Sequence, residues 1–295
     1  MYELERVGAE GFRLMGPPAF RRSIFVESQR IDACMEYAFR NDLGIAIAPL
    51  TGFKSTDLSF LSRYPSIEHL TIIDSEKIDV SAVSSLKELG YLRILGRTKQ
   101  PIDLSSFPVL RDLQVQWWSG LRFGETLPSL RVLTLSHYKP SSSDLTALPA
   151  IPHLERLHLV QCRKLALTGI DRFSRIKKLS VSYFPGLTDI SPLAAFESGD
   201  MESLEFQNCP NIANHNAVKV IWSLKRLAFN RCGEIPSLAF LNELPALESF
   251  SFVDTNIIDG DLTSCLRLRF AGFFDKRHYN YRRAEFPPAG GTTSS

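Results

Sequence analysis

The sequence lacks several features that define common classes of protein. No apolar run in its 295 residues approaches the roughly 20 needed to cross a bilayer, and the opening MYELERVGAEGFRLMG has no basic end followed by an apolar stretch. The 34 Lys and Arg residues nearly balance the 32 Asp and Glu residues, whereas nucleic-acid binders usually carry a clustered basic excess. We therefore expect a soluble, cytoplasmic protein that contacts no membrane.

Motifs that carry chemistry are also missing. The five cysteines, an odd number in a long chain, indicate a reducing compartment rather than a disulfide scaffold. There is no CxxC pair or Cys/His quartet for a metal, and no phosphate-binding glycine motif or nucleophile motif. Surface contacts explain the six histidines more simply than catalysis does. We expect no catalytic residue, no metal and no cofactor, and therefore no enzyme.

Leucine, by contrast, recurs at a regular spacing. Segments such as SLRVLTLSHY, HLERLHLVQC and RIKKLSVSYF share the pattern L-x-x-L-x-L, with other apolar residues at some places. The mean period is about 22 residues, shorter than in ankyrin, TPR or WD40 repeats. The central apolar residues of the pattern are Leu70, Leu92, Leu113, Leu133, Leu157, Leu179, Leu204, Leu227 and Phe250, and we expect Leu268 to be the next.

This spacing predicts a stack of short parallel strands. The two apolar residues of L-x-L share one face of a strand, while the residues beside them point to the other face. Between strands, apolar residues recur about every third position, as in LTDISPLAAF, where Pro192 favours turns or 3₁₀ segments over long helices. No unit can bury its apolar face alone, so neighbouring units supply the core and both ends need caps.

The pattern L-x-x-L-x-L-x-x-C/N-x-x-I/L resembles the leucine-rich-repeat family, and the stretch TDISPLAAF is similar to the bacterial internalin-like subgroup. The resemblance covers residues 43–274. It implies an α/β repeat solenoid, a horseshoe with a parallel concave sheet and a convex side of loops and 3₁₀ turns. For activity it implies recognition of a partner, because the family is mostly a binding scaffold.

The two flanks are predicted to be caps. Residues 1–42 contain three short strand candidates, the first two forming a hairpin, and then a helix with Ile31, Cys34, Met35 and Ala38 on one face. Residues 275–295 contain the basic, aromatic segment KRHYNYRR and a tail, PPAGGTTSS, whose composition predicts disorder. The basic segment could instead stack on and neutralise nucleic acid, which stays an alternative.

One position of the repeat carries cysteine. Cys162, Cys209 and Cys232 each lie five residues after a central apolar residue, where a small side chain turns inward at the end of the strand. We expect structural core thiols there, not a metal or redox site. Trp118, Tyr138 and Phe184 share this position, so they could fill the core in the same way, although Trp117 and Trp118 cannot easily both be buried.

The concave face is the candidate site. Large aromatic residues with arginine nearby are typical of interface hot spots, and partners usually dock on this face of a solenoid. The predicted partner-binding residues are the outward positions around the strand leucines, together with aromatics just beyond them. They are Arg93, Gln114, Gln116, Trp117, Trp118, His137, Tyr138, Arg156, His158, Tyr183, Glu205 and Arg226.

The sequence thus predicts a non-enzymatic, monomeric scaffold that binds another protein. The resemblance to small bacterial leucine-rich-repeat proteins implies a narrower role, an immunity or inhibitor protein that masks a toxin. Two alternatives remain open. One is a secreted effector that recognises a host protein, and the other is nucleic-acid binding through the C-terminal basic segment.

Overall fold

The computed structural model describes residues 4–7, 11–16, 21–197 and 199–288. It divides into two units, and each is described by itself. The first contains Met1–Leu135 with Pro149–Ile151, and the second contains Ser136–Leu148 with Pro152–Ser295. In the part of the chain that the structure describes, no helix has the length and apolar character needed to cross a membrane.

The first unit is built on one sheet whose strands follow each other in chain order. The first three strands pair antiparallel, and from β3 to β8 the pairing is parallel. A separate parallel pair, β7 (Ile102–Asp103) and β9 (Leu121–Arg122), joins the loops behind the sheet. The sheet strands are β1 (Leu4–Val7), β2 (Phe12–Met15), β3 (Ser23–Phe25), β4 (Gly44–Ile47), β5 (His69–Ile72), β6 (Tyr91–Ile94), β8 (Asp112–Gln116) and β10 (Val132–Ser136).

The N-terminal flank has the predicted elements. β1 and β2 form the hairpin, although residues 8–10 of its turn lie outside the described residues. Helix α1 (Ile31–Arg40) packs against β3 and β4 and buries Cys34, Met35 and Ala38, as the helical spacing predicts. The remaining turns of this unit are the 3₁₀ helices η1 (Pro49–Thr51), η2 (Ser59–Arg63), η3 (Ser75–Lys77), η4 (Ser81–Ser85) and η5 (Leu104–Ser106).

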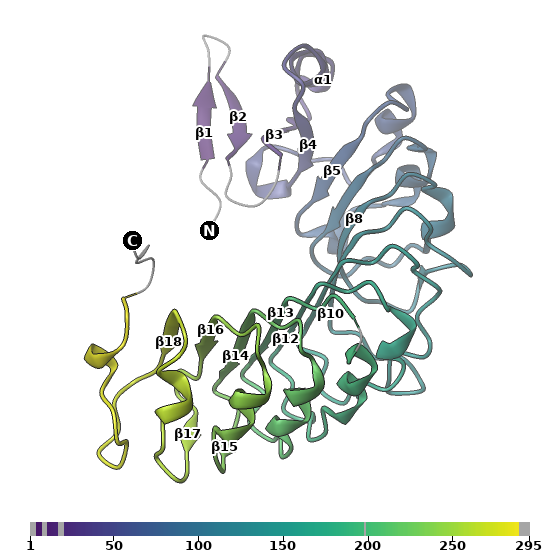
Figure 1. The fold of residues 1–295 in the computed structure, drawn as a ribbon. Helices are drawn as coiled ribbons and strands as arrows, with labels where there is room; N and C mark the ends of the chain where they lie inside the picture. The colour runs from purple at the N-terminus through teal and green to yellow at the C-terminus, as the bar shows by residue number, and fades with distance from the viewer. Residues whose placement is uncertain (1–3, 8–10, 17–20, 198, 289–295) are drawn as a thin grey trace. The chain divides into compact units, whose positions relative to one another are not determined.

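The second unit is a ladder of parallel strands, which lie side by side in Figure 1 with short helical turns along one side of them. The strands are β11 (Arg156–Val160), β12 (Lys178–Ser182), β13 (Ser203–Gln207), β14 (Arg226–Asn230), β16 (Ser249–Ser251) and β18 (Phe270–Gly272). The 3₁₀ helices are η6 (Ile170–Arg172), η7 (Ser191–Phe196), η8 (His215–Val220), η9 (Ala239–Glu243), η10 (Thr263–Cys265) and η11 (Arg283–Glu285). A small parallel pair, β15 (Glu234–Ile235) and β17 (Asn256–Ile257), lies among the turns.

The register of this ladder confirms the predicted parallel stacking. Leu157 pairs with Leu179, which pairs with Leu204, and the row continues through Leu227 to Phe250. All five side chains are at most 2% exposed. Toward the C-terminus the core becomes aromatic, with stacked rings whose centroids are 5.4 Å apart in one pair of phenylalanines and 4.8 Å apart in another. Each strand is therefore buried on its apolar face by the strands before and after it.

The last rung of the ladder differs from the prediction. Phe250 pairs with Ala271, so Ala271 is the central residue of β18, and the expectation that Leu268 would be central is wrong. Leu268 is buried three residues earlier, where Leu247 lies in the preceding repeat. The stretch Leu266-Arg-Leu268 imitates the L-x-L of a strand, but it belongs to the turn that leads into β18.

A left-handed residue follows each full strand of the second unit. These residues have φ between 54° and 62°. In all but Asp254 the amide N–H donates to a carbonyl at or just past the end of the next strand, as from Tyr183 to Gln207 at 2.8 Å. The chain then turns inward, so the next side chain enters the core. The left-handed residues are Gln161, Tyr183, Asn208, Arg231 and Asp254, and the inward ones are Cys162, Phe184, Cys209, Cys232 and Thr255.

The basic aromatic segment covers the final rung. Tyr279 and Phe286 are buried against Phe273, with ring centroids 6.1 and 5.4 Å away, and the Tyr279 hydroxyl accepts the Ile257 N–H at 3.1 Å. The Lys276 ammonium donates to the Asn256 side chain at 2.8 Å. These contacts support a cap at this end, while the predicted disordered tail falls largely on residues 289–295, outside the described residues.

The turns between repeats set a limit on side-chain size that can be tested. A methyl group at Gly186 would lie 2.3 Å from the Arg163 carbonyl oxygen, whereas one at Gly199 would meet no atom closer than 3.5 Å. We expect Gly186→Ala to lower the free energy of unfolding by about 2 kcal/mol, and Gly199→Ala to change it by less than about 0.5 kcal/mol. Urea unfolding followed by circular dichroism measures both, and equal effects would show that the turn at Gly186 has room to relax.

Candidate binding surface

The outward positions of strands β11 to β14 form one surface, here called the strand face. In the ladder register, Arg156 pairs with Lys178, Lys178 with Ser203 and Ser203 with Arg226, so these residues form its first row. Two residues further along each strand, the second row consists of His158, Ser180, Glu205 and Ala228. The three cations and Glu205 are exposed, whereas Ser203 is buried beneath its neighbours.

His158 lies half-buried in the second row. Burial lowers the pKa of its ring, and the Glu205 carboxylate, two strands away, opposes that shift. The ring is therefore mostly neutral at pH 7, and it offers one donor and one acceptor rather than a positive charge.

A row of alternating charges lies just before the strands. Basic and acidic residues follow each other from one repeat to the next, so each has an opposite charge beside it. Lys225 contacts Glu202 at 3.1 Å, and Arg269 contacts Glu248 at 3.4 Å. The pKa of Glu202 is held below its usual value, mainly by the hydrogen bond from Lys225. The row consists of Glu155, Lys177, Glu202, Lys225, Glu248 and Arg269.

Tyr183 lies at the other end of the strand face, at the left-handed position after β12. Its side chain is 49% exposed, while the neighbouring Phe184 is fully buried. A half-exposed tyrosine with a fixed backbone loses little conformational freedom when a partner covers it. Of the predicted contact residues, Arg156, Tyr183, Glu205 and Arg226 are exposed and His158 is half-buried, and all five lie in the second unit.

Two predicted contact residues belong to the core, which corrects the prediction of the site. Trp118 is only 7% exposed and its indole N–H donates to the Gln100 carbonyl at 3.1 Å. Tyr138 is 4% exposed, and burial raises its pKa to about 12. Both occupy the inward position that Cys162 holds in the repeat after that of Tyr138, so a large aromatic ring fills the space that a small thiol fills there.

The remaining predicted residues are less accessible than expected. In the first unit, Arg93 is 6% exposed, which is too buried for a primary contact. Gln114, Gln116 and Trp117 in the same unit are half-buried, as is His137 in the second unit. The strand register also places Lys178 and Ser180 on this face. The alternation along the strand predicts their outward positions, although the set of contact residues given above omits them.

The cysteines and the histidine His215 lie in the core, where they have a structural role. All five thiols are buried, and the Cys232 Sγ donates to the carbonyls of Phe206 at 3.3 Å and Asn230 at 3.2 Å. A hydrogen bond with Cys209 and burial raise the pKa of Cys232, so the thiol stays protonated. His215 is 2% exposed, and its Nε2–H donates to the Cys232 carbonyl at 2.6 Å. Among the described residues, no group of three or more His, Cys, Asp or Glu side chains could hold a metal ion.

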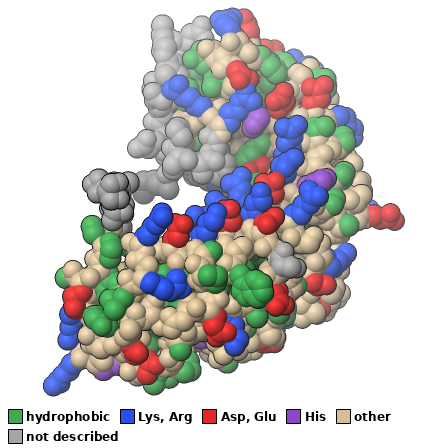
Figure 2. Space-filling model, viewed as in Figure 1, with side chains coloured by type: hydrophobic (Ala, Val, Ile, Leu, Met, Phe, Trp, Pro, Cys, Tyr) green, Lys and Arg blue, Asp and Glu red, His purple; other side chains and the backbone are tan. Residues whose placement is uncertain are grey.

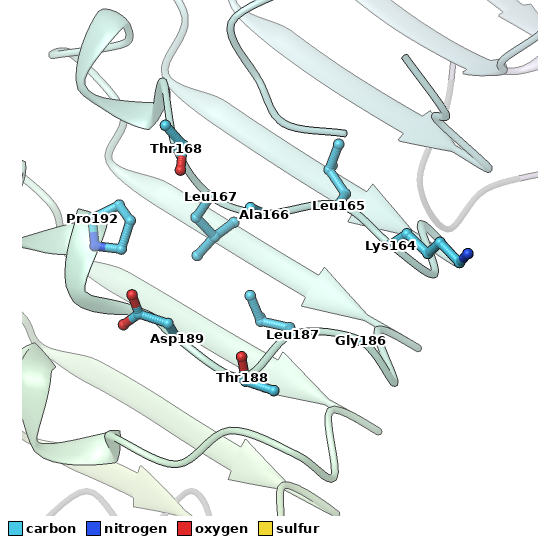
Figure 3. Close-up of a pocket in the computed structure, with 10 residues that line it drawn as sticks. All are labelled: Lys164, Leu165, Ala166, Leu167, Thr168, Gly186, Leu187, Thr188, Asp189 and Pro192. Atoms are coloured by element: carbon cyan, nitrogen blue, oxygen red, sulfur yellow. The ribbon is translucent and has the colours of Figure 1, made fainter. Parts of the chain in front are cut away.

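The cavities are small. Figure 3 shows one of about 130 Å³ in the second unit, between the loops that follow β11 and β12, with Leu165, Leu167, Leu187 and Pro192 in its lining. In the first unit, a cleft of about 240 Å³ lies beside α1, where Arg21 donates to the His69 ring at 3.2 Å. Sites for drug-sized ligands usually measure about 300 Å³ or more. On the face drawn in Figure 2, positive and negative side chains are interspersed.

The chain is similar to known repeat proteins, and the superposition with one internalin supports the repeat fold. No protein-family model matches the chain. An internalin of Listeria monocytogenes, inlF, superposes with a TM-score of 0.51 at 18% identity, over 87% of this chain and 82% of that one. The functional domain of InlJ from the same organism gives a TM-score of 0.40 at 14% identity, over 70% of this chain and 53% of that one. Leucine-rich repeat-containing protein 56 of Mus musculus is 37% identical over 91 residues, which are 30% of this chain and 16% of that protein.

Period, register and superposition together define a parallel repeat solenoid. Its repeat has the L-x-x-L-x-L strand motif followed by an inward Cys, Thr or aromatic residue and a 3₁₀ turn. The chain has the fold of a leucine-rich-repeat solenoid, as does the internalin with which it superposes.

The opposite surroundings of two tyrosines give a direct test of the core and the surface. Tyr138→Ala removes a buried ring, so we expect the free energy of unfolding to fall by about 3 kcal/mol. Tyr183→Ala removes a half-exposed ring and should change it by about 0.5 kcal/mol or less. Urea denaturation of both variants provides the comparison. If Tyr138→Ala lowered the free energy of unfolding no more than Tyr183→Ala, the burial of Tyr138 in the core would be wrong.

Buried histidines predict a loss of stability in mild acid. Burial lowers the pKa of His215 below its ordinary 6.5, so the unfolded chain takes up a proton that the folded chain does not. Stability from this group is complete above pH 6.5 and falls as the pH drops, by at most about 1.4 kcal/mol per pH unit. We expect His215→Gln to flatten this slope between pH 7.5 and 5.5 in urea unfolding curves. An unchanged slope would assign the effect to His69 and His158, whose pKa values burial also lowers.

Proposed function

We propose that this protein is a non-enzymatic scaffold that binds another protein through the strand face of its second unit. The observation that carries the proposal is the strand face itself: four register-matched strands hold exposed charged side chains in fixed rows, with a half-exposed tyrosine at one end. Arginine and tyrosine are the residue types that most often dominate the binding energy of protein interfaces. Rows that the strands already hold in register lower the entropy cost of ordering the surface when a partner binds.

The same surface is unsuited to a small molecule. It is formed by the outward side of a sheet, and the two cavities described above, of about 130 and 240 Å³, lie among loops or beside α1 rather than on it. The histidine of this surface, His158, lies in one row with Ser180, Glu205 and Ala228, and the row contains no cysteine. These surroundings favour contact over catalysis.

A narrower form of the proposal is a cytoplasmic inhibitor that masks a toxin, acting as a monomer. Its support is the similarity of the repeat to that of small bacterial inhibitors, together with a strand face of mixed charge that suits one particular protein surface. Nucleic acid is a weaker candidate partner, because Lys276, Arg282 and Arg283 of the basic C-terminal segment already donate hydrogen bonds within the protein. Arg282 donates to the Lys276 carbonyl at 2.6 Å, and Arg283 donates to the Phe286 carbonyl at 3.0 Å.

A pair of matched substitutions tests which side of the second unit binds. Ser180 lies at the centre of the strand face, and Ala195 is exposed in η7 among the turns. We expect Ser180→Trp to weaken binding of an affinity-purified partner at least tenfold, because the indole occupies the docking surface. Ala195→Trp adds the same ring among the turns and should bind normally. Calorimetric titration measures both, and normal binding by Ser180→Trp would move the interface away from the strand face.

A further inference from the structure

The first row of the strand face carries charge of one sign. Arg156 and Lys178 are paired in register on neighbouring strands, and Arg226 lies two strands beyond Lys178. Neighbouring strands are about 4.8 Å apart, so the three strand positions fall within about 15 Å. Ser203 separates the second and third cations and is only 5% exposed, so it adds no charge and little surface to the row.

These cations differ from three exposed bases that flank the strands of the unit. Lys225, Arg231 and Arg269 each make an ion pair with a carboxylate on a neighbouring repeat. Within the described part of the chain, Arg156, Lys178 and Arg226 have no carboxylate oxygen within 4 Å. Arg226 interacts with Glu202 only at longer range. It lowers the pKa of Glu202 less than Lys225 does. The row therefore keeps a local excess of positive charge in a molecule whose total charge is close to zero.

We propose that the partner docks on the strand face through a segment of its chain with clustered Asp and Glu residues. The carboxylates of this segment face Arg156, Lys178 and Arg226. This inference rests on the function proposed above and names the chemistry of the partner. Carboxylates placed against this row accept charge-assisted hydrogen bonds. At the two arginines these hydrogen bonds can be bidentate. Complementary charge also speeds association and rejects basic competitors.

Negative charges beside the row favour discrete carboxylates over a nucleic-acid backbone. Glu205 lies on the same face, about 7 Å along the strand from Ser203, since each residue of a strand advances by about 3.3 Å. Glu155, Glu202 and Glu248 lie just before the strands. A continuous line of phosphates crossing the face would meet these carboxylates, whereas a protein segment can place a donor against Glu205 and acids against the cations.

Peptide selection on the whole protein tests the inference without a known partner. A library of random 12-residue peptides displayed on phage is selected on the wild type and on Arg156→Glu/Lys178→Glu/Arg226→Glu. We expect peptides selected on the wild type to be enriched in Asp and Glu, and to bind the triple variant at least tenfold more weakly. Peptides selected on the triple variant should be enriched in Lys and Arg. The same peptide composition from both proteins would overturn the inference.

A matched control separates local charge from total charge. Lys139, Arg163 and Lys164 are exposed in loops of the second unit, outside the strand face. Lys139→Glu/Arg163→Glu/Lys164→Glu changes the net charge by the same amount, and we expect it to bind the wild-type peptides within twofold of the wild type. A loss as large as in the first triple variant would overturn the inference, because the net charge alone would then explain it.

Ser180→Trp distinguishes the two levels of the argument. If wild-type peptides lose binding to Ser180→Trp but are not enriched in acidic residues, the strand face binds and the acidic partner is wrong. If acidic peptides bind Ser180→Trp as well as they bind the wild type, the proposed surface itself is wrong. A labelled 20-nucleotide single-stranded RNA that binds the wild type tenfold more tightly than the best peptide, and loses binding in the face variant, would overturn the acidic protein segment in favour of nucleic acid.

Discussion

The register between parallel strands is the constraint on which the rest of the second unit depends. Leu179 is covered by Leu157 on one side and Leu204 on the other, and no side chain of its own repeat could replace them. Because side chains alternate along a strand, a slip of one residue would bring Arg156 into the core and turn Leu157 out to solvent. The core and the strand face are thus two consequences of one alignment.

Periodic features of the sequence predict this alignment well. The L-x-x-L-x-L spacing predicts the strands, their parallel order and their buried rows, because burial in a solenoid is decided by residues that recur once per repeat. The inward position of Cys162, Cys209 and Cys232 follows from the same counting, since a thiol is small and apolar enough for the end of a strand. The helix at 31–40 is predicted by its own local spacing.

Residues that break the local rule are those that the sequence could not place. Trp118 and Tyr138 hold an inward position occupied elsewhere by cysteine, and composition alone favours an interface for large aromatics. The space that neighbouring repeats leave decides whether such a ring is buried in the core or exposed at an interface. The local sequence does not determine that space. Arg93 shows the converse, because its outward position is predicted from the alternation along its strand, yet the side chain is covered. Leu268 was misplaced because L-x-L also occurs where a turn approaches a strand.

The division of charge into rows connects the fold to recognition. The residues just before the strands alternate in sign, so pairs such as Lys225 with Glu202 satisfy each other within the ladder. One residue further, where the strand begins, Arg156 and Lys178 are neighbours of like sign. Like charges on adjacent strands repel each other and contribute nothing to folding, so their placement opposes the stability of the isolated chain. The repulsion between Arg156 and Lys178 therefore lowers the stability of the free protein. This placement supports the proposed acidic partner, whose opposite charges would relieve the repulsion on binding.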